Sequence, residues 1–171
     1  MLRNFSISAA GMALVLGTLG LTGTSAATAL VNNETDDAGT GRLSVAAESG
    51  TWRPYGNTNP ITSSSSTWRC AGSRTLATNV IAQVCAIRSP GGGAVQGAVI
   101  VRNDRSSLYS VQAAMDLYTS SEINLGTWSC SSSGVGANSW SVCFGQTVTQ
   151  SSPVDSVGIA NGVSLGISPL A

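Results

Sequence analysis

Apolar and polar residues alternate with a period of two through much of this chain, which is the pattern of half-buried β-strands. The clearest segment is 94–102, where three valines share one face and the polar residues Gln96 and Arg102 share the other. In residues 76–88, a strand or a strand pair, both faces are apolar, as in a strand covered on two sides. The sequence Ser-Pro-Gly-Gly-Gly at 89–93 marks a break between the two segments. These patterns predict antiparallel strands.

Two segments permit more than one interpretation. Residues 108–118 alternate as a strand does, but Val111 and Met115 also fit one face of a helix. We predict a strand, because β segments flank it and a short turn joins it to its neighbour. Residues 157–167 alternate around Asn161-Gly162, a strong hairpin signal, although one long final strand also fits.

Three further strands are expected at 42–48, 123–130 and 139–148. Residues 131–138 contain two glycines and predict a hairpin loop between the last two of these strands. Residues 49–67 are rich in Gly, Pro and Ser and predict a long loop. Roughly seven to nine short strands with turn signals at near-regular spacing predict an all-β fold, an antiparallel β-sandwich or barrel.

The four cysteines stand in two similar units, each of which begins Thr-Trp-x-Cys. Three pairings are possible, and the two local ones, Cys70–Cys85 and Cys130–Cys143, are the economical choice. A disulfide that closes a loop of about 15 residues contributes roughly 3 kcal/mol to stability. A zinc site is disfavoured, because the chain has neither Cys-x-x-Cys spacing nor histidine. If residues 130–143 form a hairpin, Cys130 faces Cys143 across it.

The N-terminus predicts export. A single charge at Arg3 precedes an apolar run over residues 7–21, and small residues follow, which is the pattern of a secretory signal peptide. Cleavage after Ala26 or after Ala27 fits equally well. The apolar run is shorter than the roughly 20 residues of a spanning helix. We therefore expect a secreted, extracellular protein with a signal peptide at 1–26, a flexible segment at 27–41 and a single β domain at 42–171.

Charge is sparse, at 9% of residues against roughly 25% in typical proteins. Lysine is absent, and loss of Arg3 with the signal peptide leaves seven arginines against eight carboxylates. This balance gives no basic patch for nucleic acid and none for a membrane surface after signal removal. The remaining core is rich in Ala and Val, so disulfides help to stabilise it.

Catalysis is not expected from these residues. Without histidine or lysine the chain lacks the usual general bases and a Ser-His-Asp triad. A carboxylate pair is the remaining option, as in glycoside hydrolysis. No metal or cofactor is expected either, because residues 34–45 match a calcium loop poorly, with Ala38 and Val45 at ligand positions. The acidic candidates in the domain are Glu48, Asp104, Asp116, Glu122 and Asp155.

The export signal, the strand Val95–Asn103, the Leu-Tyr strand after it and the pair Cys130…Cys143 together resemble small secreted proteins of actinobacteria. The resemblance covers about residues 67–148. It implies an immunoglobulin-like sandwich and an extracellular location. It implies no activity and no site residue.

Three functions fit these observations, and in each the partner is an unknown protein or polysaccharide. The first is a secreted, non-catalytic β-sandwich that acts by binding or interaction. The second is a carbohydrate- or cell-wall-binding module, with Trp52 and Tyr55 as a ligand platform, because flat aromatic faces suit sugar rings. The third is an inhibitor of a secreted enzyme. The other tryptophans, Trp68, Trp128 and Trp140, are expected to cover the disulfides.

Overall fold

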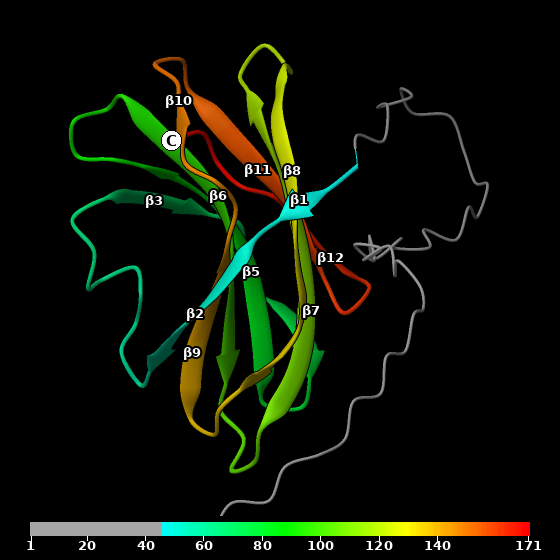
Figure 1. Cartoon of the computed structure of the whole chain (residues 1–171). Coiled ribbons are helices and arrows are strands. Elements are labelled where there is room, and N and C mark those ends of the chain that lie inside the picture. Colours follow the sequence, from blue (N-terminus) through cyan, green and yellow to red (C-terminus); the bar gives the residue numbers. More distant parts are fainter. Residues whose placement is uncertain (1–45) are drawn as a thin grey trace, which may run out of the picture. The chain divides into compact units, whose positions relative to one another are not determined.

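The computed structural model describes residues 46–171, and their regular structure is entirely β-strand (Figure 1). The predicted signal peptide, the segment 27–41 and residues 42–45 lie outside the described residues. The strands are β1 (Glu48–Ser49), β2 (Thr51–Gly56), β3 (Thr67–Cys70), β4 (Arg74–Ala77), β5 (Val80–Arg88), β6 (Ala94–Asn103), β7 (Tyr109–Thr119), β8 (Asn124–Val135), β9 (Ser139–Phe144), β10 (Val148–Thr149), β11 (Val154–Ala160) and β12 (Val163–Ile167).

These strands form two sheets that face each other, which confirms the predicted antiparallel sandwich (Figure 1). Sheet A has the order β1-β8-β7-β11-β12. Sheet B has the order β2-β9-β6-β5-β3, and β10 and β4 pair with β6 and β5. All strand pairs are antiparallel except β1 with β8. The described residues hold 12 strands, more than the roughly seven to nine expected, because short edge strands carry little periodicity.

The alternation in the sequence sets the faces of the long strands. Residues 76–88 are a strand pair, β4 and β5, separated by a turn in which Asn79 has a φ of 60°. Residues 108–118 are strand β7, as predicted, because the alternate residues from Val111 to Leu117 are buried between the sheets. The two valine-rich strands β5 and β6 pair along their whole length, from Val80 opposite Asn103 to Arg88 opposite Val95.

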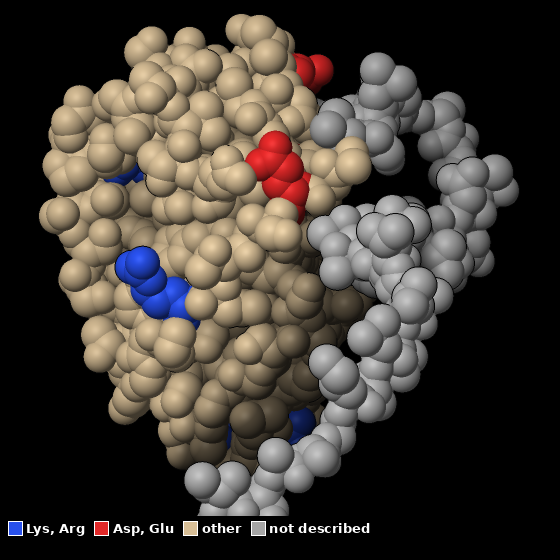
Figure 2. Space-filling model, viewed as in Figure 1, with Lys and Arg blue, Asp and Glu red and all other residues tan. Residues whose placement is uncertain are grey.

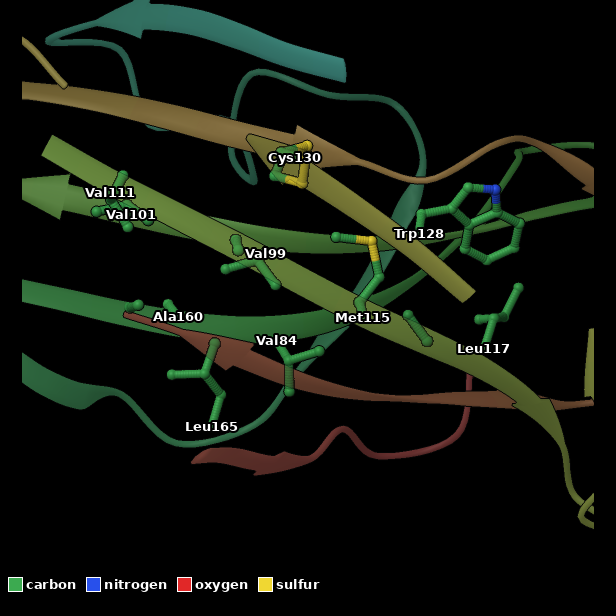
Figure 3. Close-up of a cluster of buried hydrophobic side chains, with 14 of the residues drawn as sticks. Val84, Val99, Val101, Val111, Met115, Leu117, Trp128, Cys130, Ala160 and Leu165 are labelled. Atoms are coloured by element: carbon green, nitrogen blue, oxygen red, sulfur yellow. A yellow bond between two sulfur atoms is a disulfide. The ribbon is translucent and has the colours of Figure 1, made fainter. Parts of the chain in front are cut away.

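The main core fills the space between the sheets with small and medium aliphatic side chains (Figure 3). Trp128 is its large aromatic residue, 2% exposed, and it belongs to the same buried cluster as Cys130 and Cys143. A core of mostly valine and alanine buries less apolar area per residue than one of leucine and phenylalanine, so covalent links between the sheets matter more. Residues of this core labelled in the close-up are Val84, Val99, Val101, Val111, Met115, Leu117, Ala160 and Leu165.

Both predicted disulfides form, but the hairpin predicted around the second one is wrong. Residues 131–135 continue strand β8 in sheet A, whereas β9 belongs to sheet B. The Cys130–Cys143 bond therefore joins the two sheets through the core. Each strand has a better partner elsewhere, since β8 pairs with β7 over a long register and β9 pairs with both β6 and β2.

The predicted loop 49–67 is also wrong in its first half, because Thr51–Gly56 is strand β2. Strand β2 lies at the edge of sheet B, where one side of the backbone needs no ladder partner. Pro54 is tolerated there, although the same residue reads as a loop signal in sequence. Of the first predicted strand, 42–48, residues 42–45 lie outside the described residues, and of residues 46–48 only Glu48 lies in a strand, the two-residue β1.

Two glycine positions shape the connections. The chain crosses from β1 in sheet A to β2 in sheet B at Gly50, where a Cβ would lie 2.8 Å from both Cys130 Sγ and the Phe144 carbonyl oxygen. Only glycine allows the backbone to pass this close over the disulfide. Asn161 and Gly162 form the predicted hairpin turn between β11 and β12, with φ values of 45° and 78° that match a type I′ turn.

Candidate functional site

A second apolar cluster covers the outer face of sheet B, away from the main core. Its centre is fully buried, and aromatic side chains surround it. This outer-face cluster explains why β5, β6 and β9 are apolar on both faces. Its buried members are Cys85, Ile87, Ala98, Ile100 and Val142, and the residues packed against them are Tyr55, Ile61, Trp68, Cys70, Trp140 and Phe144.

Residues 57–66, the connection from β2 to β3, supply part of the cover of this cluster. Pro60 is buried and Ile61 packs into the cluster. The connection is fixed by its own hydrogen bonds: Asn59 Oδ1 accepts from the Ile61 amide at 2.9 Å, and Ser63 Oγ donates to the Asn59 carbonyl at 2.9 Å. The segment is therefore an ordered wall beside the sheet.

Between this wall and the edge strand β2 lies a groove of about 380 Å³, which we call the outer-face groove. Its volume falls in the range of small-molecule sites. Aromatic side chains supply much of its apolar surface, and hydroxyl, amide and guanidinium groups supply the rest. The lining residues are Thr51, Arg53, Tyr55, Ser64, Ser66, Trp68, Ile87, Gln96, Phe144 and Gly145.

The apolar floor of the groove follows from the register of sheet B. Phe144 on β9 lies opposite Ala98 on β6, and Ala98 lies opposite Cys85 on β5. Cys85 in turn pairs with Cys70, and Trp68 stands two residues before Cys70 on the same face. Because alanine is short, Ala98 leaves room above this row for the aromatic rings. The Trp68 and Phe144 rings are in edge contact, with centroids 6.0 Å apart at an angle of 66°.

Several polar groups around this floor are not used inside the protein. The guanidinium of Arg53 and the hydroxyls of Thr51, Tyr55 and Ser66 make no hydrogen bond to any part of the chain that the structure describes. Gln96 donates through Nε2 to the Gly145 carbonyl at 2.8 Å, which leaves its Oε1 as an acceptor. The groove thus combines an aromatic floor with free donors and acceptors at its sides.

The two residues of the predicted ligand platform lie on opposite faces of β2. Tyr55 lines the outer-face groove, whereas Trp52 packs against the main core and lies opposite Cys143. The Trp52 indole N–H donates to the Ser131 carbonyl of β8 at 2.8 Å. Residues three apart in a strand point to opposite faces, so these two side chains do not share one surface.

The other three tryptophans differ in their burial and in the groups that contact their rings. Trp128 is enclosed in the core, and Trp140 lies in the outer-face cluster with the Arg102 guanidinium 5.2 Å from its ring centroid. Trp68 is partly buried, and its indole N–H is closed off from solvent without a hydrogen-bond partner. Trp68 therefore offers carbon surface to the groove, not a donor.

The acidic candidates are placed away from this groove. Asp116 lies on the outer face of sheet A, where its carboxylate accepts from Thr127 Oγ1 at 2.6 Å. Asp155 stands on the neighbouring strand β11, opposite Tyr118, and Glu122 is in the turn after β7. Asp104 pairs with Arg102.

Within residues 46–171, no group of three or more His, Cys, Asp or Glu residues is placed to hold a metal ion. The same residues contain no helix that could cross a bilayer.

Of the predicted ligand platform only Tyr55 lines the groove, and Arg53, Gln96 and Phe144 are among the lining residues that the sequence did not indicate. A signal for Phe144 existed in residues 140–144, where Trp140, Val142 and Phe144 alternate on the face opposite Cys143. An apolar row on each face of a strand indicates that both faces are covered. Arg53 carries no such signal, because the Gly, Pro and Ser content of residues 49–67 predicts a loop there.

Comparison with known proteins finds no protein-family model and no curated protein that matches the chain in sequence. The predicted relation to secreted actinobacterial proteins therefore stays a prediction, as does the immunoglobulin-like character of the sandwich.

Proposed function

We propose that this chain is an extracellular, non-catalytic binding protein that holds a carbohydrate in the outer-face groove. The observation that carries the proposal is the aromatic floor of Trp68, Tyr55 and Phe144, bordered by hydrogen-bonding groups that the protein itself leaves unused.

A sugar ring matches both parts of this groove. Its C–H faces are apolar and flat enough to lie on an aromatic ring, while its hydroxyls need donors and acceptors around the rim. Buried polar groups that lose water must recover hydrogen bonds, so free hydroxyls beside an aromatic floor favour a hydroxyl-rich ligand over a purely apolar one.

The binding role is supported by the ionisable groups present. Among the described residues that line the groove, Arg53 and Tyr55 are the titratable ones, so these residues do not supply the carboxylate pair that glycoside hydrolysis uses. The extracellular location is supported by the two disulfides and by the predicted signal peptide, because disulfides persist in oxidising compartments.

The test is retention of the oxidised protein on insoluble chitin, cellulose and peptidoglycan, compared among single variants. We expect retention on at least one polymer and a loss of about tenfold or more in affinity for Tyr55→Ala and Trp68→Ala, as for a central aromatic contact. Trp52→Phe and Trp140→Phe are the matched controls, since both positions lie outside the groove and keep an aromatic ring. Circular dichroism confirms that each variant is folded.

Equal retention of Tyr55→Ala, Trp68→Ala and the unmodified protein would place the carbohydrate elsewhere and overturn the proposed site. No retention on any polymer, together with no binding of soluble oligosaccharides, would overturn the function. In that case capture of a proline-rich peptide, which also binds aromatic grooves, or inhibition of a secreted enzyme would replace it.

A further inference from the structure

We infer that the outer-face groove selects saccharides that carry a carboxylate, such as chains of uronic acids, over neutral saccharides. This inference rests on the proposed function and deepens it. The observation behind it is a single arginine, Arg53, whose charge is neither paired nor hydrogen-bonded within residues 46–171 and which borders the aromatic floor.

Two other arginines, Arg88 and Arg102, are held by the protein itself. Like Arg53, the side chains of Arg69, Arg74 and Arg105 make no ion pair or hydrogen bond within residues 46–171, but none of these three residues lines this groove. Arg88 donates to the carbonyl oxygens of Gly92, Gln150, Ser152 and Ala171, at 2.6 to 3.0 Å. The last three of these hydrogen bonds hold residues 150–152 and Ala171 against sheet B, so the Arg88 guanidinium has a structural role.

Arg102 is used in the same way. It pairs with Asp104, donates to Asn57 Oδ1 at 2.9 Å and to the Asn138 carbonyl at 3.0 Å, and lies over the Trp140 ring. Arg53 is exposed and has no ion pair or hydrogen bond of this kind within residues 46–171, although it lies near the Phe144 ring. Its five N–H donors are therefore available to a ligand.

The position of Arg53 suits a substituent on a bound sugar ring. Its guanidinium carbon lies 5.8 Å from the centroid of the Phe144 ring, which is part of the groove floor. A sugar that rests on the floor would bring an equatorial or exocyclic group to this guanidinium. A carboxylate fits the planar fork of arginine with two parallel hydrogen bonds, which a neutral hydroxymethyl group cannot make.

No negative charge of residues 46–171 pairs with Arg53. Arg53 is the only charged residue among the ten that line the groove. Figure 2 shows a face on which isolated charged side chains stand in a surface that is otherwise uncharged, in keeping with 9% charged residues in the chain. A lone positive group beside an apolar floor attracts an anionic ligand, and salt weakens that attraction.

The experiment is isothermal titration of the unmodified, oxidised protein with paired probes: oligomers of galacturonate, glucuronate and mannuronate, and the methyl esters of the same oligomers. Each pair has the same ring and linkage and differs only at the carboxyl group, which is an anion in the acid and a neutral methyl ester in its counterpart. We expect at least one acid form to bind about tenfold more tightly than its ester at low salt, with the ratio falling towards one at about 1 M NaCl.

Variants assign the effect to Arg53. Arg53→Gln should abolish the preference for the acid form while the ester still binds, and Arg53→Lys should restore part of it. Arg69→Gln is the matched control, because Arg69 is also an exposed arginine on an edge strand of sheet B but does not line the groove. It should keep the full ratio.

The possible failures are distinguishable. If acid and ester bind equally, or if neutral oligosaccharides bind more tightly than both, the carboxylate selectivity is wrong while the proposed function stands. A preference that survives in Arg53→Gln would assign it to another residue and also overturn the inference. If none of the saccharides binds, the proposed function fails with it.

Discussion

The two Thr-Trp-x-Cys units of this chain have nearly the same sequence, but their Trp and Cys side chains lie on opposite faces of the sandwich layers: one pair faces the main core and the other faces outward. In each unit the Trp and the Cys stand two residues apart in a strand, so their side chains share a face. In β8 that face points into the sandwich, and Trp128 and Cys130 are buried in the main core. In β3 it points out of the sandwich, and Trp68 and Cys70 are partly buried in the outer-face cluster.

The surroundings of the two tryptophans differ accordingly. Trp128 is enclosed by backbone: a Cβ on Gly145 would lie 2.6 Å from its Cε3 atom, and a Cβ on Gly126 would also overlap its ring. Trp68 meets another side chain, Phe144, at the floor of an open groove. The same local motif thus contributes to the main core in sheet A and to a candidate binding surface in sheet B. The difference depends on the sheet to which the strand belongs and on the face that it presents.

The largest difference should appear when each tryptophan is removed. Trp128→Ala leaves a cavity between the sheets and should lower the free energy of unfolding by about 3–5 kcal/mol. Trp68→Ala lies at an edge strand beside solvent, which can fill the space, and should lower it by about 1–2 kcal/mol. Urea denaturation followed by circular dichroism measures both. Equal losses for the two variants would show that the outer-face cluster is as essential to stability as the main core.

Removal of each disulfide should give the next largest effects. Their sequence separations, 13 and 15 residues, are so similar that chain entropy predicts about 3 kcal/mol for each. Any difference between the two losses in the free energy of unfolding therefore reflects how deeply each disulfide is buried. The double variant Cys130→Ala/Cys143→Ala should lose more stability than Cys70→Ala/Cys85→Ala, because it removes two buried sulfur atoms from the main core.

Hydrogen exchange sharpens this comparison. Without Cys70–Cys85, faster exchange should be confined to β3 and residues 57–66, since β3 is an edge strand that pairs with β5 alone. Without Cys130–Cys143, exchange should rise across both sheets. The opposite pattern would mean that the outer disulfide organises the whole sandwich.

A smaller effect is expected from adding one methyl group next to Trp128. Gly145→Ala places a Cβ 2.6 Å from the indole ring of the buried Trp128, so we expect the free energy of unfolding to fall by about 1–3 kcal/mol from overpacking. Gly72→Ala is the matched control, because a Cβ there meets nothing within 4 Å, and it should change stability by less than about 0.5 kcal/mol. A thermal melt compares the two; similar melting temperatures would show that the ring can shift at little cost.

The period-two pattern predicts those features of the fold that depend on a single strand, such as which residues share a face. The faces of β5, β6 and β7 were predictable because each is long enough for alternation to be counted. Strand β2 was not, since it carries Pro54 and Gly56 and owes its conformation to pairing with β9. Of the groove, Tyr55 was anticipated as an exposed aromatic residue, whereas Arg53 and Phe144 were not.

The reason lies in how the groove is built. Its lining comes from β2, β3, β5, β6, β9 and the connection 57–66, which meet only in the assembled sheet. Phe144, Ala98, Cys85 and Cys70 form one row across four neighbouring strands, and Trp68 stands two residues before Cys70 on the same face. No local pattern in the sequence encodes that row.

The sequence by itself determined which residues share a face of a strand, where the Asn161-Gly162 turn falls and which cysteines are close enough in the chain to pair economically. These are local consequences of a two-residue period, of turn chemistry and of loop length. Only the tertiary structure decided which sheet each strand joins, and hence that β8 turns Trp128 inward while β3 turns Trp68 outward. Sheet membership rests on backbone hydrogen bonds between distant segments, and those bonds carry no side-chain pattern that one segment could reveal alone.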